Sequence, residues 1–383
     1  MGVQIMETKN EKLWFLQSIR AIATIMVMYS HWGELFWSRP DIAATLSYSV
    51  QIDNAKRPFF LFITDRLEFS FGPFGVALFF MVTGYLIVHS LENNRISIFL
   101  VKKFLRLYST YSVTLLLTCG ILYISANYWN IPYNISVTDY LKNLSLFRDF
   151  YWVQSLDMVN WTMEVQVKFY LLCAFIMYVS KMRNTKTITI LIGALTTLSY
   201  CVGTIYEYAL QQGLLKTYIW MYAIIYAVPF IIFCFIGVVF YYYDSKVWNL
   251  KTSICMIIYL IVMYYIAIGI AYPGNMMYPI SYYSAFIVFL LIFRFRKHIP
   301  RIRVLSFLAD ISFPVYLIHG VVGFAIMNFL YQYQPYPYLI MLETFVLIIL
   351  LSYLLHCFIE KPSIKLVNMI AKRIDKCIES KEQ

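Results

Sequence analysis

Residues 13–36 read LWFLQSIRAIATIMVMYSHWGELF, an apolar run of helix length that contains an arginine and a histidine. Arg20 and His31 are eleven residues apart, about three turns of an α-helix, so both side chains lie on one face, roughly 16 Å apart along the axis. Ionisable groups inside a membrane span are costly and usually face a partner or a water-filled cavity. This face is therefore expected to point at protein or at a substrate path. A buried contact with a glutamate that only orients helices is the alternative.

The composition indicates the class of protein. Of the 383 residues, 61% are hydrophobic and 13% are charged, and the mean hydropathy is +0.66. These values are typical of an integral membrane protein with several spans. The first apolar run is long enough to span and lacks a small-residue cleavage site, so we expect it to stay in the mature protein. The seven cysteines show neither a disulfide pattern nor metal-ligand spacing, and no metal is expected.

We predict an all-α, polytopic membrane protein with about ten transmembrane helices, because sheet edges facing lipid would leave backbone groups unpaired. An even number of spans places both termini on one side. Lys and Arg are about three times as numerous in the segments on that side as on the other, which predicts that both termini are cytoplasmic. The net charge of +11 therefore reflects topology and does not indicate a nucleic-acid partner. The predicted spans are 14–36, 70–92, 104–126, 161–180, 187–206, 219–243, 252–271, 280–295, 305–329 and 338–359.

The chain is expected to form one membrane domain, residues 1–359, followed by a basic cytoplasmic tail, residues 360–383, whose amphipathic pattern suits the inner leaflet. Two outer segments, 37–69 and 127–160, are longer than a connection requires and are rich in Asn, Asp, Ser and aromatic residues. They are the places where a polar acceptor would be held at the outer surface. No internal repeat or linker is visible.

Small and basic residues at two further spans suggest specific roles. Gly75 and Gly84 in the second span allow another helix to approach closely, which is the usual role of small residues in membranes. Lys103 and Arg106 open the third span one turn apart on the same side. Such a pair either anchors the helix at the inner boundary or holds the phosphates of a cytosolic cofactor, for which paired cations are suited.

Six segments resemble, in order, the signature blocks of the acyltransferase-3 family of membrane acyltransferases. Each block alone is weak, but six in order within this hydropathy profile are strongly specific and cover nearly the whole chain. The resemblance implies transfer of an acyl group, most often acetyl from acetyl-CoA, to a sugar of a surface polysaccharide, lipopolysaccharide or related glycan. It is to the stand-alone form without a soluble esterase-like domain. The segments are the Arg20 and His31 pair, residues 75–86, the Lys103 and Arg106 pair, and residues 161–170, 312–319 and 360–362.

The resemblance also implies roles for individual residues. His31 matches the essential histidine of the first span and Arg20 its paired arginine, so both are expected to be catalytic. Lys103 and Arg106 match the basic pair at the inner end of the third span and are expected to bind the cofactor. Glu360 is expected to make a helix-end contact rather than to act in catalysis.

Three further matches concern substrate or supporting residues. Trp161 opens a block in which many relatives carry an acidic residue five positions later, where this chain has Gln166. The nearby carboxylate is Glu164, expected either to contact substrate or to pair with Lys168 four residues on. His319 ends the late block and is expected either to support the substrate or to form a structural hydrogen bond.

The chemistry fits these residue types. An alcohol is a poor nucleophile until its proton is removed, and histidine is a suitable base near neutral pH. His31 is the expected base, acting directly or through an acyl-imidazole. Acetyl-CoA is cytosolic, whereas a surface glycan or lipid-linked saccharide is completed outside. Arg20 and His31 would then connect the two faces of a bacterial inner (cytoplasmic) membrane.

Two alternatives remain open from the sequence. A glycan or small-molecule transporter without chemistry would use Arg20 and His31 to line a permeation path, and the absence of a visible repeat weighs against it. An enzyme of the same fold would use another donor, such as succinyl-CoA, or another acceptor, such as peptidoglycan or an antibiotic.

Overall fold

The apolar runs form helices in the computed structural model, which is 82% helical and has no strand among the residues it describes. It describes residues 2–52, 58–59, 61 and 68–382, with side chains except at 2–13, 215–218 and 376–382. The all-α prediction is confirmed. The elements are α1 Gly2–Tyr29, η1 Ser30–Leu35, α2 Phe36–Ser38, α3 Pro40–Ser47, α5 Phe71–Glu92, α6 Ile96–Tyr128, α7 Val137–Leu144, η2 Arg148–Tyr151, α8 Asn160–Val179, α9 Thr185–Gln211, α10 Leu215–Asp244, α11 Leu250–Ala271, α12 Met277–Arg294, η3 Arg296–His298, α13 Arg303–Ile318, α14 Val321–Tyr331, α15 Pro337–Leu355, η4 His356–Glu360 and α16 Lys361–Glu382.

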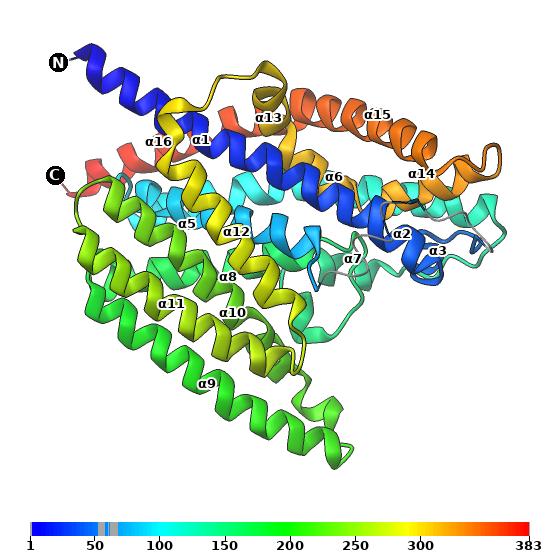
Figure 1. Cartoon of the computed structure of the whole chain (residues 1–383), viewed down its shortest axis with the longest axis horizontal. Helices are drawn as coiled ribbons and strands as arrows, with labels where there is room; N and C mark the ends of the chain where they lie inside the picture. Colours follow the sequence, from blue (N-terminus) through cyan, green and yellow to red (C-terminus); the bar gives the residue numbers. More distant parts are fainter. Residues whose placement is uncertain (1, 53–57, 60, 62–67, 383) are drawn as a thin grey trace.

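The multi-pass character is confirmed as well. In the described part of the chain, eight helices are long and apolar enough to cross a membrane, or nine if a bent pair counts as one span. The first predicted span, 14–36, is not among them, and there the α-helix stops at Tyr29 and a π-helical turn takes over. α1 begins and α16 ends at the same end of the bundle (Figure 1). The side that faces the cytoplasm stays a prediction.

The ninth predicted span, 305–329, is broken into two helices. α13 and α14 meet at an angle of 78°, and Gly320 lies at the break, where a Cβ atom would come within 2.9 Å of the carbonyl oxygen of Asp157. The indole Nε1 of Trp32 donates a 2.8 Å hydrogen bond to the carbonyl oxygen of His319, which the broken helix leaves free. The prediction of one continuous span was wrong here, because hydropathy reports apolar length and not direction.

The outer segment 127–160 folds partly into the bundle. Between α7 and α8, the side chains of Leu146, Asp149 and Asp157 are buried. Oδ1 of Asp157 accepts hydrogen bonds from the backbone N–H groups of Val159 and Asn160, at 3.1 and 2.9 Å, and so caps the start of α8. Burial raises the pKa of the Asp157 carboxyl. Part of this stretch therefore contributes to the interior, and the expectation that it holds an acceptor at the outer surface stays a prediction.

The remaining predicted segments differ in how much of them is described. In 37–69, α3 packs against α14, while residues 53–57, 60 and 62–67 lie outside the described residues. The predicted tail continues as α16, which packs against α6. In η4, Nδ1 of His356 lies 2.7 Å from Oε2 of Glu360, so Glu360 makes the expected helix-end contact.

Glycines set the spacing of the central helices. α5 packs between α1 and α10. A Cβ atom on Gly84 would lie 1.8 Å from the carbonyl oxygen of Cys234, and one on Gly237 would lie 2.0 Å from that of Met81. A Cβ atom on Gly75 would lie 2.8 Å from the carbonyl oxygen of Ala23 in α1. The close approach predicted for Gly75 and Gly84 is thus confirmed, and it fixes α5 as the central packing helix.

Gly84→Ala should therefore destabilise the protein. Its Cβ atom would overlap a backbone atom that cannot rotate away, and overpacking of this kind costs about 1–3 kcal/mol. Gly120→Ala in α6 is the matched control, because nothing lies within 4 Å of its Cβ atom and alanine favours a helix over glycine by about 1 kcal/mol. Thermal unfolding in detergent measures both, and equal melting temperatures would contradict the close packing of α5 and α10.

Candidate functional site

Arg20 and His31 both reach the same neighbour, α13 with its C-terminal end. Nη2 of Arg20 donates a 2.7 Å hydrogen bond to Oγ of Ser312. The imidazole of His31 stacks on that of His319, with ring centroids 4.7 Å apart and planes inclined by 8°. Ser312 and His319 are seven residues apart, about two turns along the helix. Among the described residues neither Arg20 nor His31 forms an ion pair, so the alternative of a glutamate contact is not what the structure contains.

The two stacked histidines each have a ring nitrogen that is buried and has no hydrogen-bond partner in the described ranges, Nδ1 of His31 and Nε2 of His319. Nδ1 of His319 lies 2.9 and 3.1 Å from the carbonyl oxygens of Tyr316 and Val315. Carbonyl oxygens only accept, so Nδ1 is the donor and the lone pair of Nε2 stays free in the neutral ring. Because buried polar atoms are normally paired, these nitrogens mark a candidate functional position.

A π-helical turn presents His31. Such turns are rare and often occur at functional sites. Two sets of contacts fix the position of η1. Oε2 of Glu34 accepts hydrogen bonds from Oγ of Ser30 and Oγ of Ser70, at 3.0 and 3.2 Å. Trp32 packs against α14 so closely that a Cβ atom on Gly323 would lie 2.2 Å from its Nε1 atom. His31 therefore sits on a segment that is fixed on both sides.

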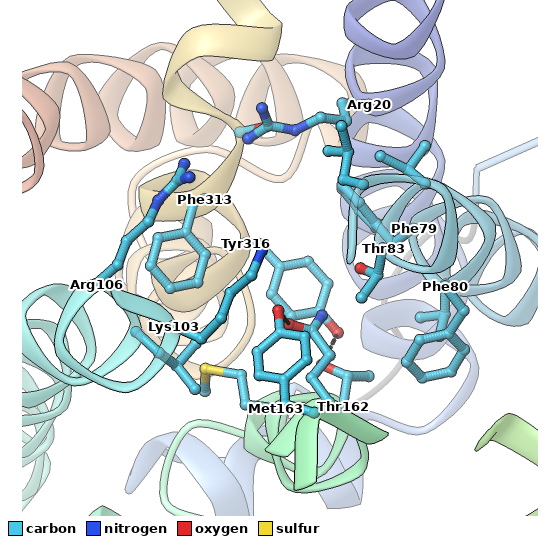
Figure 2. A pocket seen from close by; sticks show the side chains of 17 residues that line it. Arg20, Phe79, Phe80, Thr83, Lys103, Arg106, Thr162, Met163, Phe313 and Tyr316 are labelled. Atoms are coloured by element: carbon cyan, nitrogen blue, oxygen red, sulfur yellow. Dashed lines mark hydrogen bonds between the residues drawn. The ribbon is translucent and has the colours of Figure 1, made fainter. Parts of the chain in front are cut away.

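A cavity of about 190 Å³ lies between α1, α5, α6, α8 and α13 (Figure 2). Arg20, Lys103 and Arg106 line it, and none of the described lining residues is Asp or Glu. In Figure 2 the three cationic side chains approach the same space from two sides. Nζ of Lys103 also lies 5.8 and 5.5 Å from the ring centroids of Phe99 and Tyr170, where each ring face attracts a cation. The cavity is therefore suited to an anionic ligand.

Tyr316 separates this cavity from the two histidines. Its ring lines the cavity and its centroid lies 5.7 Å from that of His319. Its hydroxyl group is 2.9 Å from Oγ1 of Thr162, which also lines the cavity (Figure 2). The cationic cavity and the histidine pair are thus neighbours, with a tyrosine–threonine contact between them.

Glu164 points away from the cavity. Its two carboxylate oxygens accept hydrogen bonds from Nε and Nη2 of Arg148 at 3.0 and 3.2 Å, and its side chain is only 1% exposed. Lys168 pairs instead with Asp149. The predicted pairing of Glu164 with Lys168 was wrong, because η2 folds inward and supplies both charges of α8 with a partner of opposite sign.

The other residues of this block take different positions. Gln166 lines the cavity. At this position, five residues after Trp161, the chain therefore has an amide where the resemblance implies an acidic residue in many relatives. Trp161 does not line it. Its ring packs against Phe80, Tyr226 and Phe230 with centroids 6.3, 5.6 and 5.2 Å away, which assigns it a packing role.

Ser312, Tyr316 and Thr162 were not predicted individually. A signal was present for two of them, because Ser312, Tyr316 and His319 follow the i, i+4, i+7 spacing that places residues on one helix face. Nothing in the sequence indicated Thr162, which reaches Tyr316 from another helix. In the described ranges, no three His, Cys, Asp or Glu side chains gather in a way that would hold a metal ion.

A comparison with protein families agrees with this arrangement. The model of the acyltransferase domain, acyltransferase-3, matches residues 13–357, nearly the whole chain, including α1 with Arg20, η1 with His31, α6 and α13. No curated protein and no solved structure matches the sequence. The chain therefore belongs to the acyltransferase-3 family of membrane acyltransferases.

Proposed function

We propose that the protein is an O-acyltransferase that moves an acyl group, with acetyl as the expected one, from a cytosolic acyl-CoA to a hydroxyl of a surface glycan or lipid-linked saccharide. The observation that carries the proposal is the cavity with three cations and its neighbour, the stacked histidines with free nitrogens. A cavity lined by cations and by no described carboxylate is suited to a thioester that bears phosphates. An imidazole nitrogen without a hydrogen-bond partner is suited to act in acyl transfer. A bacterial inner membrane would separate such a donor from such an acceptor.

Each residue has a role that follows from its position. Lys103 and Arg106 hold phosphate groups of the donor. Arg20, oriented by Ser312, faces the cavity beside Lys103 and Arg106 and adds positive charge for the anionic donor. His31 is the catalytic histidine. The cavity, about 190 Å³, is smaller than the roughly 300–1,000 Å³ of ordinary ligand sites, so it takes the acyl-pantetheine end up to the phosphates beside Lys103 and Arg106 and leaves the adenosine outside.

Lys103→Ala and Arg106→Ala should each weaken the binding of acetyl-CoA. A charge-assisted hydrogen bond contributes about 1.5–3 kcal/mol, which corresponds to a Kd about 10- to 150-fold higher. Lys102→Ala is the matched control, since Nζ of Lys102 bonds to Oδ1 of Asn94 at 2.5 Å and Lys102 does not line the cavity. Calorimetry with detergent-purified protein measures the three affinities, and unchanged binding in both test variants would show that Lys103 and Arg106 do not hold the phosphates.

Sealed proteoliposomes of known orientation test the function against the transporter alternative. Acetyl-CoA supplied at the cytoplasmic face should release CoA at that face and leave acetyl groups on lipid-linked saccharide presented at the other. Movement of a solute without thioester cleavage would contradict the enzyme. Acetylation only of acceptor on the donor's side would contradict transfer across the membrane. Replacing acetyl-CoA by succinyl-CoA identifies the donor.

A further inference from the structure

His319 occupies a position that is unfavourable for stability. It is fully buried, it lies at the break between α13 and α14, and its Nε2 atom has no partner in the described part of the chain. An apolar side chain would fill the same space without an unpaired nitrogen, and leaving one unpaired is costly. Departures of this kind from good packing are expected at functional sites.

The surroundings of His319 fix how it can handle a proton. Two backbone carbonyl oxygens, of Val315 and Tyr316, hold the hydrogen on Nδ1, and Trp32 ties the carbonyl of His319 to the segment that carries His31. Nε2 is thus held as a proton acceptor, as a carbonyl orients a catalytic imidazole. His31 lies face to face with this ring at 4.7 Å, so the two imidazoles are in direct contact.

We propose that the two histidines divide the transfer: His31 takes the acyl group from the thioester, and Nε2 of His319 takes the proton of the acceptor hydroxyl in a second step. This inference rests on the proposed function and goes beyond it. A direct transfer needs only one base, because the hydroxyl proton ends on the departing thiolate. A second imidazole, oriented as an acceptor, is explained by a second step.

Both steps balance without a further reactant. In the first, a nitrogen of neutral His31 attacks the thioester carbonyl, the carbon–sulfur bond breaks, and its electron pair leaves with the thiolate. The proton on the other nitrogen of His31 then goes to the thiolate, leaving a neutral acyl-imidazole and free CoA. In the second, the acceptor oxygen attacks the acyl carbon and the carbon–nitrogen bond breaks. The hydroxyl proton moves to Nε2 of His319 and on to the released nitrogen of His31, so both rings end neutral.

The contact of Tyr316 and Thr162 between the cavity and the histidines is consistent with acylation of His31 first and transfer to the acceptor second. An acyl-imidazole is hydrolysed by water, and a site that excludes water protects it. The contact between Tyr316 and Thr162 has to open for the thioester to reach His31, and once closed again behind the departing CoA it keeps water in the cavity from the acyl group. The tight contact of Trp32 with Gly323 closes the side of α14. The acyl group can therefore wait on His31 after CoA has left on its own side.

His319→Asn separates the two steps, because an asparagine amide can still donate to the carbonyls while Nε2 is lost. Purified full-length protein is mixed with acetyl-CoA labelled in the acetyl group, without acceptor. Wild type and His319→Asn should each release about one CoA per protein in a burst and carry the label on the peptide of His31. His31→Asn should release none. Acetate released by alkali from the surface polysaccharide of cells should fall about 10²- to 10⁴-fold for His319→Asn.

Hydroxylamine provides a second readout, since it attacks an acyl-imidazole without a base. It should discharge the label from wild type and His319→Asn at equal rates. His298→Asn, an exposed histidine of η3, is the matched control and should behave as wild type throughout. His319→Gln replaces the asparagine variant if the latter does not fold, as judged by thermal unfolding.

The outcomes separate this inference from the proposed function. Wild type that acetylates acceptor but shows no burst without it would overturn the two steps and leave the function intact. A folded His319→Asn variant that binds acetyl-CoA without a burst, or that transfers normally in cells, would overturn the role of His319. Wild type that cleaves none of acetyl-, propionyl- and succinyl-CoA in the presence of acceptor membranes would overturn the proposed function itself.

Discussion

His31→Ala should abolish acyl transfer while the protein still folds and inserts into the membrane. The substitution removes the imidazole that we propose to take the acyl group, and loss of such a group lowers rates by about 10²- to 10⁴-fold. The structural loss is small, because in the described part of the chain the ring of His31 stacks on His319 and meets the edge of Phe324, and an aromatic pair contributes about 0.5–1.5 kcal/mol. Alkali-labile acetate on the surface polysaccharide measures transfer, and immunoblotting of membranes measures the amount of protein.

The control for this variant is His89→Ala. His89 lies near the end of α5, is exposed, contacts Asn93 and the ring of Tyr241, and does not line the cavity. Its transfer should equal that of wild type. Wild-type transfer by His31→Ala would refute the assignment of the catalytic histidine, and loss of folded protein would show that the stacked pair is a packing element instead.

Much of the fold followed from patterns along the chain. Apolar runs of helix length predict spans because lipid requires them, and the spacing of Arg20 and His31 predicts a shared face because a helix repeats every 3.6 residues. Both residues indeed reach one helix, α13, at Ser312 and at its C-cap residue His319. The convergence of Arg20 with Lys103 and Arg106 in one cavity was not predictable, since it depends on how α1 and α6 pack around α13.

The predictions that were wrong also failed because they depend on packing between distant parts of the chain. The break at Gly320 depends on the carbonyl of Asp157 and the indole of Trp32, which come from distant parts of the chain. Likewise, an i, i+4 spacing is a sound reason to pair Glu164 with Lys168 only if no better partner arrives from elsewhere. The inward fold of η2 brought such partners, and nothing in its polar, aromatic sequence distinguishes it from a surface loop.

That inward fold leads to a large expected effect on stability. Arg148→Met should strongly destabilise the protein, because it leaves the carboxylate of Glu164, 1% exposed, without its cation. Breaking a buried ion pair on one side costs about 3–5 kcal/mol. Thermal unfolding in detergent measures the loss. Arg39→Met is the matched control, since Arg39 pairs with Asp41 in an exposed contact and exposed pairs contribute at most about 1 kcal/mol.

The double variant Arg148→Met with Glu164→Gln tests the reason. With both charges gone, no buried carboxylate is left unpaired, so most of the lost stability should return, as it does when a buried pair is replaced as a unit. The double variant should also transfer acyl groups at temperatures where it is folded, because Glu164 faces Arg148 and not the cavity. If it melts like wild type but no longer transfers, Glu164 contacts substrate. If its stability stays as low as that of Arg148→Met, the guanidinium holds η2 through the carbonyl of Val153 rather than through charge.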